Sequence, residues 1–280
     1  MTEKYTTTQI QRFVELNGDE RAMEEAFTTI AQRNEAFKKK ESALVKAGKE
    51  NISRLLNGEH KTLAKKVEDS LETWLTQKEG FTRVSTPTII TAAMLEKMTI
   101  TKDHPLTNQV FWIDSKKCLR PMLAPNLYEV MRDLHKITKE PVRIFEAGSC
   151  FRKESQGAEH MNEFTMLNFV ELAGVKDGDQ MERLKELATG AMKALGIEKY
   201  DLIMEKSEVY IETLDIEVDG IELASGAYGP HPLDAQWGIF DTWVGIGFGI
   251  ERIAMVKGGY QTIKRVGKSI SYLDGTPLNL

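Results

Sequence analysis

The segment Trp243-Val-Gly-Ile-Gly-Phe-Gly-Ile-Glu-Arg252 is the stretch that indicates the fold most strongly. Its glycines fall at alternate positions, 245, 247 and 249, so one face of an extended strand carries no side chains and a flat ligand can lie against the backbone. Position 250 is Ile, so the G-x-G-x-x-G dinucleotide fingerprint is excluded. A glycine strand alone is more often a packing contact. The Glu-Arg pair and the helix predicted over 249–257 favour a ligand site.

The remaining periodicities predict strands joined by hairpins, with helices between them. Strands are predicted at 81–87, 142–151, 163–171, 208–218, 221–228 and 269–272, a hairpin at 108–122, and helices at 67–79, 124–135 and 180–195. This order does not form βαβ units, so we predict an α+β fold with an antiparallel β-sheet flanked by helices. We expect a short helical N-terminal region, 1–66, followed by a larger domain, 67–280, that holds the sheet.

Composition narrows the class of protein. The 280 residues are 41% hydrophobic and 28% charged with a net charge of −5, which excludes a collagen, a coiled-coil rod and a largely disordered chain. The two cysteines, Cys118 and Cys150, form no C-x-x-C pair, which excludes a cysteine-rich zinc site. The N-terminus lacks the apolar core of a signal peptide, and no run is long enough to span a membrane. We therefore expect a cytoplasmic protein.

The N-terminal region departs from the acidic balance of the chain. Residues 31–66 hold ten Lys or Arg against four Glu, a local charge of +6. A solvated helical face and a surface that follows nucleic-acid phosphates are about equally good interpretations of such a segment. On charge alone, the lysines that would contact a nucleic acid are Lys38, Lys39, Lys40, Lys61, Lys65 and Lys66.

A second candidate site is Phe151-Arg152-Lys-Glu154, followed by a polar loop and Phe164. Arg152 and Glu154 share a strand face, and arginine presents a fork of donors suited to a phosphate. Phe164 on the returning strand could stack on a purine. An R-x-E pair by itself is usually a surface ion pair, so this motif gains weight only in combination with the others.

A third candidate is the hairpin around Asp219-Gly220, a strong two-residue type I′ turn signal. This turn pairs Glu217 with Glu222, and like charges placed opposite each other repel. A cation such as Mg²⁺ with a nucleotide would relieve the repulsion, although two solvated glutamates are the simpler interpretation. Ser225 could share a ligand with Glu222 only if Gly226 marks a bulge.

A fourth candidate combines a helix and a strand. Ala124, Leu127, Tyr128 and Met131 lie on one helix face, which usually means plain core. The strand 163–171 places Asn168 on the same face as apolar neighbours. A buried amide needs hydrogen-bond partners, so Asn168 is either satisfied by backbone or is the polar reader of an apolar pocket.

Together these segments resemble the class II aminoacyl-tRNA synthetases. Gly80-Phe-Thr-Arg-Val-Ser-Thr-Pro87 is similar to motif 1, the dimer-interface strand; Phe151 to Phe164 is similar to motif 2; Gly245 to Arg252 is similar to motif 3. Leu119 to Tyr128, Glu163 to Phe169 and Trp243 to Gly249 narrow the resemblance to the pyrrolysyl branch of that family, in a compact form without a separate tRNA-binding domain.

The resemblance implies a homodimer that activates pyrrolysine, an Nε-acylated lysine, with ATP and transfers it to a cognate tRNA. Arg152 and Arg252 would be catalytic, and Mg²⁺ would be held by Glu222 and Ser225. ATP would contact Arg152, Glu154, His160, Met161, Phe164, Met166, Glu222, Leu223, Ser225 and Arg252. The amino acid would contact Ala124, Leu127, Tyr128, Met131, Asn168, Val170, Tyr210, Ala227, Trp243 and Gly247.

Two observations refine this expectation. The implied amino-acid pocket contains no carboxylate to pair a lysine ammonium, which favours an uncharged, acylated lysine, since an unpaired buried charge is costly. Tyr228, where smaller residues are usual in the family, either trims the pocket or faces away from it. Two other functions remain open: a paralogue that adenylates another amino acid for a non-tRNA acceptor, and a non-catalytic binding module on the same fold.

Overall fold

A seven-stranded sheet forms the centre of the protein, whose computed structural model describes residues 2–153, 157–207 and 209–280. The strand order is β3-β6-β7-β11-β10-β9-β8. These strands are β3 (Thr82–Arg83), β6 (Val142–Phe151), β7 (Glu163–Leu172), β8 (Asp201–Ser207), β9 (Ile211–Val218), β10 (Ile221–Gly229) and β11 (Trp243–Gly249). Neighbouring strands are antiparallel except β3 and β6, which run parallel. The α+β prediction is confirmed, with a sheet that is mixed at one edge.

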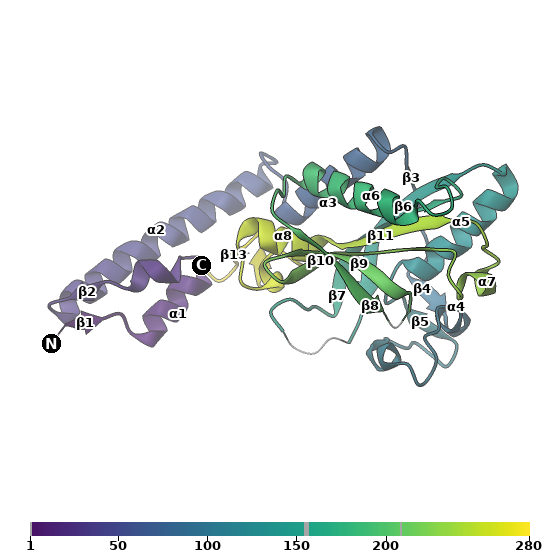
Figure 1. Ribbon diagram of the computed structural model, residues 1–280. Coiled ribbons are helices and arrows are strands. Elements are labelled where there is room, and N and C mark those ends of the chain that lie inside the picture. The colour runs from purple at the N-terminus through teal and green to yellow at the C-terminus, as the bar shows by residue number, and fades with distance from the viewer. Residues whose placement is uncertain (1, 154–156, 208) are drawn as a thin grey trace.

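Helices cover both faces of this sheet (Figure 1). One face packs against α3 (Leu63–Gln77), α6 (Gln180–Leu195) and α8 (Ile250–Gly258). The other packs against α5 (Ala124–Thr138), near which lie α4 (Ala92–Lys97) and α7 (Asp234–Trp237). The predicted stripe of α3, Val67, Leu71, Trp74 and Leu75, is buried. Strand alternation explains the two cores: Phe169 of β7 faces the α3 side, whereas Val170 faces the α5 side.

Several short elements differ from the sequence-based expectation. The segment 108–122 contains β5 (Lys117–Leu119), which pairs with β4 (Ile89–Thr91), and only a single bridge joins Trp112 to Cys118. Strand β8 has no counterpart among the predicted strands. The expected terminal strand at 269–272 is a small pair made by β12 (Tyr272–Leu273) and β13 (Thr276–Pro277). Short 3₁₀ turns occupy Glu20–Met23, Pro105–Gln109 and Ile263–Arg265.

The N-terminal region projects from the sheet domain, and the C-terminus lies beside it (Figure 1). It consists of β1 (Glu3–Lys4), α1 (Thr7–Glu15), β2 (Ala26–Phe27) and the long α2 (Ile30–Leu56). No residue of α2 is fully buried, although Phe37 and Leu44 pack against a small cluster made by Tyr5, Phe13 and Met23. The division at residues 66 and 67 stays a prediction, and α3 begins before it, at Leu63.

One buried side chain connects this region to the segment that follows α8. Arg265 donates from Nη1 to the carbonyl oxygen of Glu15 (2.9 Å) and from Nη2 to that of Val14 (2.8 Å). Its guanidinium lies over the ring of Tyr272, 5.0 Å from the centroid. These contacts dock α1 onto the segment after α8. In the described part of the chain, no helix combines the length and apolar character that crossing a membrane requires.

Candidate active site

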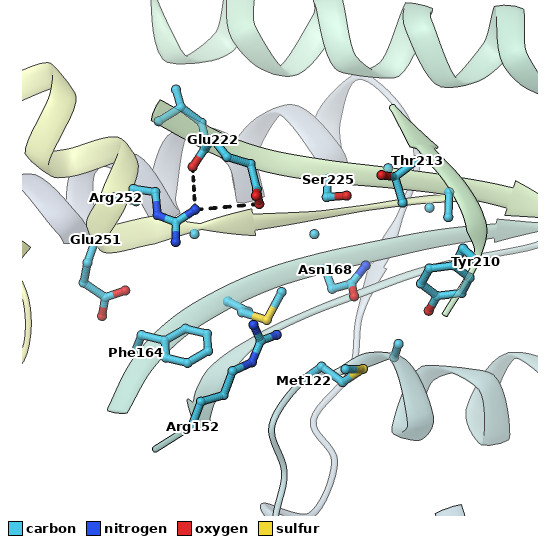
Figure 2. Close-up of a pocket in the computed structure, with 18 of the residues that line it drawn as sticks. Met122, Arg152, Phe164, Asn168, Tyr210, Thr213, Glu222, Ser225, Glu251 and Arg252 are labelled. Atoms are coloured by element: carbon cyan, nitrogen blue, oxygen red, sulfur yellow. Dashed lines mark hydrogen bonds and ion pairs between the residues drawn. The ribbon is translucent and has the colours of Figure 1, made fainter. Parts of the chain in front are cut away.

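A cavity of about 300 Å³ opens over β7, β9, β10 and β11, on the side of the sheet away from α3 and α6 (Figure 2). One end carries the charged side chains Arg152, Glu222 and Arg252, and the other end carries Tyr210 and Met122 (Figure 2). The cavity therefore has a polar end suited to phosphates and a largely apolar, aromatic end suited to an uncharged side chain.

The end of β6 and the start of β7 supply Arg152 and Phe164. Arg152 donates from Nε to the carbonyl oxygen of Pro121 (2.9 Å), which directs its guanidinium over the Phe164 ring, 5.4 Å from the centroid. Both side chains border the cavity, as do His160, Met161 and Met166. Glu154 lies outside the described residues, so its predicted contact with ATP stays a prediction.

The β9–β10 hairpin has the predicted turn and register. Asp219 and Gly220 both have positive φ, 51° and 78°, as a type I′ turn requires, and Glu222 pairs with Glu217. Glu222 and Ser225 were expected to share a ligand only if Gly226 marks a bulge, but Gly226 pairs regularly with Leu214. The register shifts instead between Glu222 and Ala224. The extra residue reverses the alternation, so Glu222 and Ser225 border the same cavity.

Hydrogen bonds fix the Ser225 hydroxyl and the backbone of Glu222. Ser225 donates its hydroxyl hydrogen to Asp215 Oδ1 (2.6 Å), and Arg252 Nη1 donates to the carbonyl oxygen of Glu222 (2.7 Å). Burial raises the pKa of the Glu222 carboxyl, and the nearby Arg252 opposes that rise. No group of three or more Asp, Glu, His or Cys suited to a metal occurs among the described residues. Glu222 and Ser225 offer a carboxylate and a hydroxyl, oxygen ligands of the kind that Mg²⁺ prefers.

The three glycines of β11 clear the floor of the cavity, and all of them border it. A Cβ at Gly247 would lie 3.0 Å from Met166 Cε and 3.6 Å from Asn168 Oδ1, in space that a ligand can occupy. Asn168 pairs with Gly247 across the strands and donates from Nδ2 to the carbonyl oxygen of Ile246 (2.9 Å). The backbone therefore satisfies part of this amide, while the side chain still faces the cavity.

The aromatic end is built from α5, β11 and the segment before β9. Tyr210 and Tyr128 each meet the Trp243 ring edge to face, at centroid distances of 6.0 and 5.6 Å. Ala124, Val170 and Ala227 also border the cavity. Leu127 and Met131 are fully buried in the core on this side of the sheet and do not reach the cavity wall. Tyr228 faces away from the cavity and packs against the α6 side, as strand alternation from Ala227 requires.

Sequence reasoning missed several residues at this site. Met122, Thr213, Glu251 and Ile263 border the cavity. Glu251 accepts a hydrogen bond from the Thr165 backbone N–H (2.8 Å), and its position beside Arg252 in the predicted helix was the available signal. A buried carboxylate, Asp234, lies behind Tyr128 and Trp243 without bordering the cavity. No local pattern pointed to it, and its partner Tyr128 lies 106 residues earlier in the chain.

The lysines proposed from charge lie on α2, on α3 and between them. Ion pairs join Lys40 to Glu25 and Lys61 and Lys65 to Asp69. In the part of the chain that the structure describes, no ion pair involves Lys38, Lys39 or Lys66. The last three are therefore the cations of this set best able to exchange solvent for an external phosphate.

Comparison with known proteins agrees with this geometry. The core domain of class II tRNA synthetases matches residues 49–274. Among curated relatives, an O-phosphoserine--tRNA(Cys) ligase of Methanococcus maripaludis is 24% identical over 55% of this chain and 30% of its own length. A phenylalanine--tRNA ligase alpha subunit of Malacoplasma penetrans is 26% identical over 64% of this chain and 58% of its own length. The chain thus spans less than two thirds of these relatives.

Solved structures give a match over the whole chain. A crystal structure of pyrrolysyl-tRNA synthetase from Desulfitobacterium hafniense is 47% identical, covers 100% of both chains and superimposes with a TM-score of 0.89. A second structure of a pyrrolysyl-tRNA synthetase from the same organism is 46% identical, with a TM-score of 0.87. The chain therefore belongs to the class II aminoacyl-tRNA synthetases and, within them, to the pyrrolysyl-tRNA synthetase family.

Proposed function

We propose that this protein ligates pyrrolysine to its cognate tRNA in two steps. The amino-acid carboxylate attacks the α-phosphate of ATP, giving the aminoacyl-adenylate and pyrophosphate, and a ribose hydroxyl at the end of the tRNA then takes the aminoacyl group. The observation that carries this proposal is one cavity with arginines at one end and an aromatic, amide-bearing chamber at the other. A cavity of this kind can hold a nucleotide and an uncharged amino-acid side chain side by side.

At the polar end, the chemistry needs positioning and electrostatic stabilisation rather than a nucleophile from the protein. Arg152 binds the α-phosphate and offsets the charge that develops on it during attack. His160 and Arg252 bind the β- and γ-phosphates, and Phe164 stacks on the adenine ring. The fixed directions of Arg152 and Arg252, each held by a backbone carbonyl, support these roles, because little reorganisation is then needed during the reaction.

We assign Mg²⁺ binding to Glu222 and Ser225, in company with the phosphates of ATP. A Mg²⁺ ion usually keeps several waters and binds one or two carboxylates together with substrate phosphates. One carboxylate and one hydroxyl on a shared face fit that pattern, and a larger cluster is not needed. The bound ion would neutralise charge on the leaving pyrophosphate.

At the aromatic end, Asn168 hydrogen-bonds the amide group of the acylated lysine, and Tyr210 closes over its ring. The acidic residues Glu222 and Glu251 lie at the opposite end of the cavity, beside Arg252 (Figure 2). The carboxylate nearest to the aromatic end, Asp234, is occupied by hydrogen bonds from Tyr128 and Trp243. No carboxylate is therefore placed to pair a free lysine ammonium among the described residues of this end, which supports the choice of an acylated lysine.

Two assembly proposals accompany this activity. The N-terminal region contacts tRNA phosphates, chiefly through Lys38, Lys39 and Lys66. The protein forms a homodimer through its motif 1 side, where Ile89, Trp112 and Ile113 are exposed on or beside β4 and β5. Exposed apolar groups gathered in this way favour a protein interface. We expect the protein to act in the cytoplasm, where its tRNA substrate is used.

ATP–pyrophosphate exchange tests the first step. The assay compares pyrrolysine or a lysine carbamate analogue with the twenty standard amino acids, and then adds the tRNA to follow aminoacylation. Exchange with the acylated lysine alone is the expected result. Exchange with a standard amino acid would contradict the substrate, and exchange without charging of tRNA would favour another acceptor.

The Arg252→Ala variant separates catalysis from simple binding. It should lose exchange, whereas Arg21→Ala, which changes an exposed arginine far from the cavity, should retain it. Full retention in Arg252→Ala would favour a non-catalytic binding module.

A further inference from the structure

Behind the aromatic end of the cavity, one buried carboxylate receives hydrogen bonds from two of the rings that form its wall. Asp234 is 1% exposed. Its Oδ1 accepts the Tyr128 hydroxyl hydrogen (2.8 Å), and its Oδ2 accepts the Trp243 indole N–H (2.7 Å). The backbone N–H of His231 also donates to Oδ2 (2.6 Å). Tyr128 and Trp243 border the cavity, while Asp234 does not.

The two rings come from separate elements. Tyr128 lies on α5 and Trp243 begins β11, so nothing in the local backbone sets the distance between them. A carboxylate can accept both donors at once because it has two oxygens. Burial raises the pKa of the Asp234 carboxyl, and the hydrogen bonds from Trp243 and Tyr128 oppose that rise by stabilising the charged form. Charge-assisted hydrogen bonds of this kind are short and directional. Asp234 therefore holds the Tyr128 and Trp243 side chains, which form two sides of the aromatic end of the cavity, in fixed positions.

The ring system around Asp234 is closely packed. The Tyr128 ring stacks on Trp237, with centroids 5.2 Å apart, and Trp243 meets Tyr210 on its other side. A Cβ at Gly229 would lie 1.9 Å from Trp243 Nε1 and 2.5 Å from Asp234 Oδ2, so the backbone at the end of β10 closes the remaining space. Burial raises the pKa of the Tyr128 hydroxyl, which keeps its proton and remains a donor.

We propose that Asp234 is a positioning residue that sets the shape of the acyl-binding chamber, and hence which acyl groups on lysine are accepted, by holding Tyr128 and Trp243. This inference rests on the proposed function, since it concerns the specificity of the same cavity. Asp234 does not contact the substrate. Its oxygens already accept three donors, so it offers no site for a lysine ammonium.

The Asp234→Asn variant tests the proposal because it keeps the size of the side chain and turns one acceptor into a donor. If the amide N–H₂ faces the two donors at Oδ2, Trp243 is released. If it faces Tyr128, the hydroxyl can accept the amide hydrogen, but the charge-assisted bond is lost and the hydroxyl hydrogen loses its acceptor, so Tyr128 is held more weakly. The expected result is a rise of about tenfold in KM for the acylated lysine, the size of one missing charge-assisted hydrogen bond, with kcat and the KM for ATP within about twofold of wild type. The ratio of the kcat/KM values for lysine bearing a small acetyl group and for lysine bearing a larger carbamate should also move closer to one.

Two further variants separate this role from a general loss of structure. Tyr128→Phe removes one donor while keeping the ring, and should change the acyl preference in the same direction. Combined with Asp234→Asn, its effect should be less than additive, because both changes break the same hydrogen bond. Asp103→Asn repeats the chemical change at an exposed position and should leave all parameters unchanged.

Each contrary outcome has a definite meaning. Unchanged KM and acyl preference in Asp234→Asn would overturn the proposal, as would an equal rise in the KM for ATP, which would indicate general damage. If Asp234→Asn does not fold, an unchanged acyl preference in Tyr128→Phe overturns it. Activation of free lysine by the wild type but not by Asp234→Asn would show that Asp234 pairs an ammonium instead. Absence of exchange by the wild-type protein with every acylated lysine would contradict the proposed function itself.

Discussion

Arg252 and Glu222 are joined at two points: Arg252 Nη1 lies 2.7 Å from the carbonyl oxygen of Glu222 and 3.7 Å from its Oε1. The first turn of α8 is thereby tied to the strand that carries the proposed metal ligands. The same guanidinium that orients the backbone of β10 also offsets the charge of the carboxylate. Both contacts come from the same nitrogen, so the fork of the guanidinium has a second nitrogen to present to a phosphate, whereas lysine ends in a single nitrogen and could not do both.

Replacing Arg252 with Lys should lower the rate of ATP–pyrophosphate exchange by about 10²–10³, the usual cost of removing one electrostatic contact to a transition state. The melting temperature should change little, because the side chain borders an open cavity rather than the packed core. Exchange kinetics and thermal unfolding check the two expectations together. A comparable loss in Arg21→Lys would show that the effect is not specific to this site.

The hydrogen bond from Ser225 to Asp215 predicts a change in the magnesium requirement. Asp215→Asn leaves both proposed ligands in place but loosens Ser225, and outer partners of this kind alter metal affinity by about 10–100-fold. Exchange measured against Mg²⁺ concentration at constant ATP should show a higher half-saturating concentration. The rate at saturating Mg²⁺ should recover. An unchanged requirement would indicate that Ser225 does not ligate the ion.

Glu251 predicts a pH dependence of stability. Burial raises the pKa of its carboxyl above the ordinary value, so the folded chain binds more protons than the unfolded chain between the two pKa values. Stability contributed by this residue therefore falls as pH rises through that window. Glu251→Gln keeps an oxygen that can accept the Thr165 N–H and removes the charge. Its melting temperature should exceed that of wild type at neutral pH, and the difference should shrink toward acidic pH.

The matched control for this titration is Glu198→Gln, which changes an exposed glutamate. Its melting temperature should follow the wild type at every pH. If the difference in melting temperature between Glu251→Gln and wild type stayed constant from neutral to acidic pH, the stability would not depend on the protonation of Glu251.

The glycines of β11 should differ in what they tolerate. Gly247→Ala places a methyl group beside Asn168 Oδ1 and Met166 Cε, inside the cavity, and should raise the KM for the amino acid by about tenfold, within the usual cost of overpacking. Gly245→Ala places its methyl 2.8 Å from the backbone oxygen of Phe169, which cannot move aside, and should destabilise the fold. Substrate kinetics and thermal melts distinguish the two. An equal loss of stability in the Gly247→Ala and Gly245→Ala variants would contradict the placement of the Gly247 methyl group inside the cavity.

The basic N-terminal surface predicts a salt-dependent effect on tRNA binding. Changing Lys38 and Lys39 together to Ala should weaken tRNA affinity and reduce the slope of log affinity against log salt by about 2, one for each phosphate that the lysines no longer neutralise. Amino-acid activation without tRNA should be unaffected. The ion-paired Lys61 and Lys65 provide the control pair, and their replacement should change the slope less. An unchanged slope for Lys38 and Lys39 would place the tRNA surface elsewhere.

Local sequence determined the elements whose energetics are local. The Asp219-Gly220 turn selects its hairpin register because both residues must adopt positive φ. The apolar stripe of α3 and the bounds of α6 follow from helical periodicity. The alternate glycines of β11 could also be placed on one face from the sequence, because successive side chains of a strand point to opposite faces whatever packs against them.

Tertiary structure decided the features that depend on distant partners. The bulge between Glu222 and Ala224, rather than at Gly226, depends on how β10 is held between β9 and β11, and it brings Glu222 and Ser225 together. Asp234 meets Tyr128, 106 residues earlier, only because α5 and α7 pack on the same side of the sheet. A sequence pattern records periodicity along one element, whereas a buried carboxylate shared by two elements is stabilised only when both have packed around it.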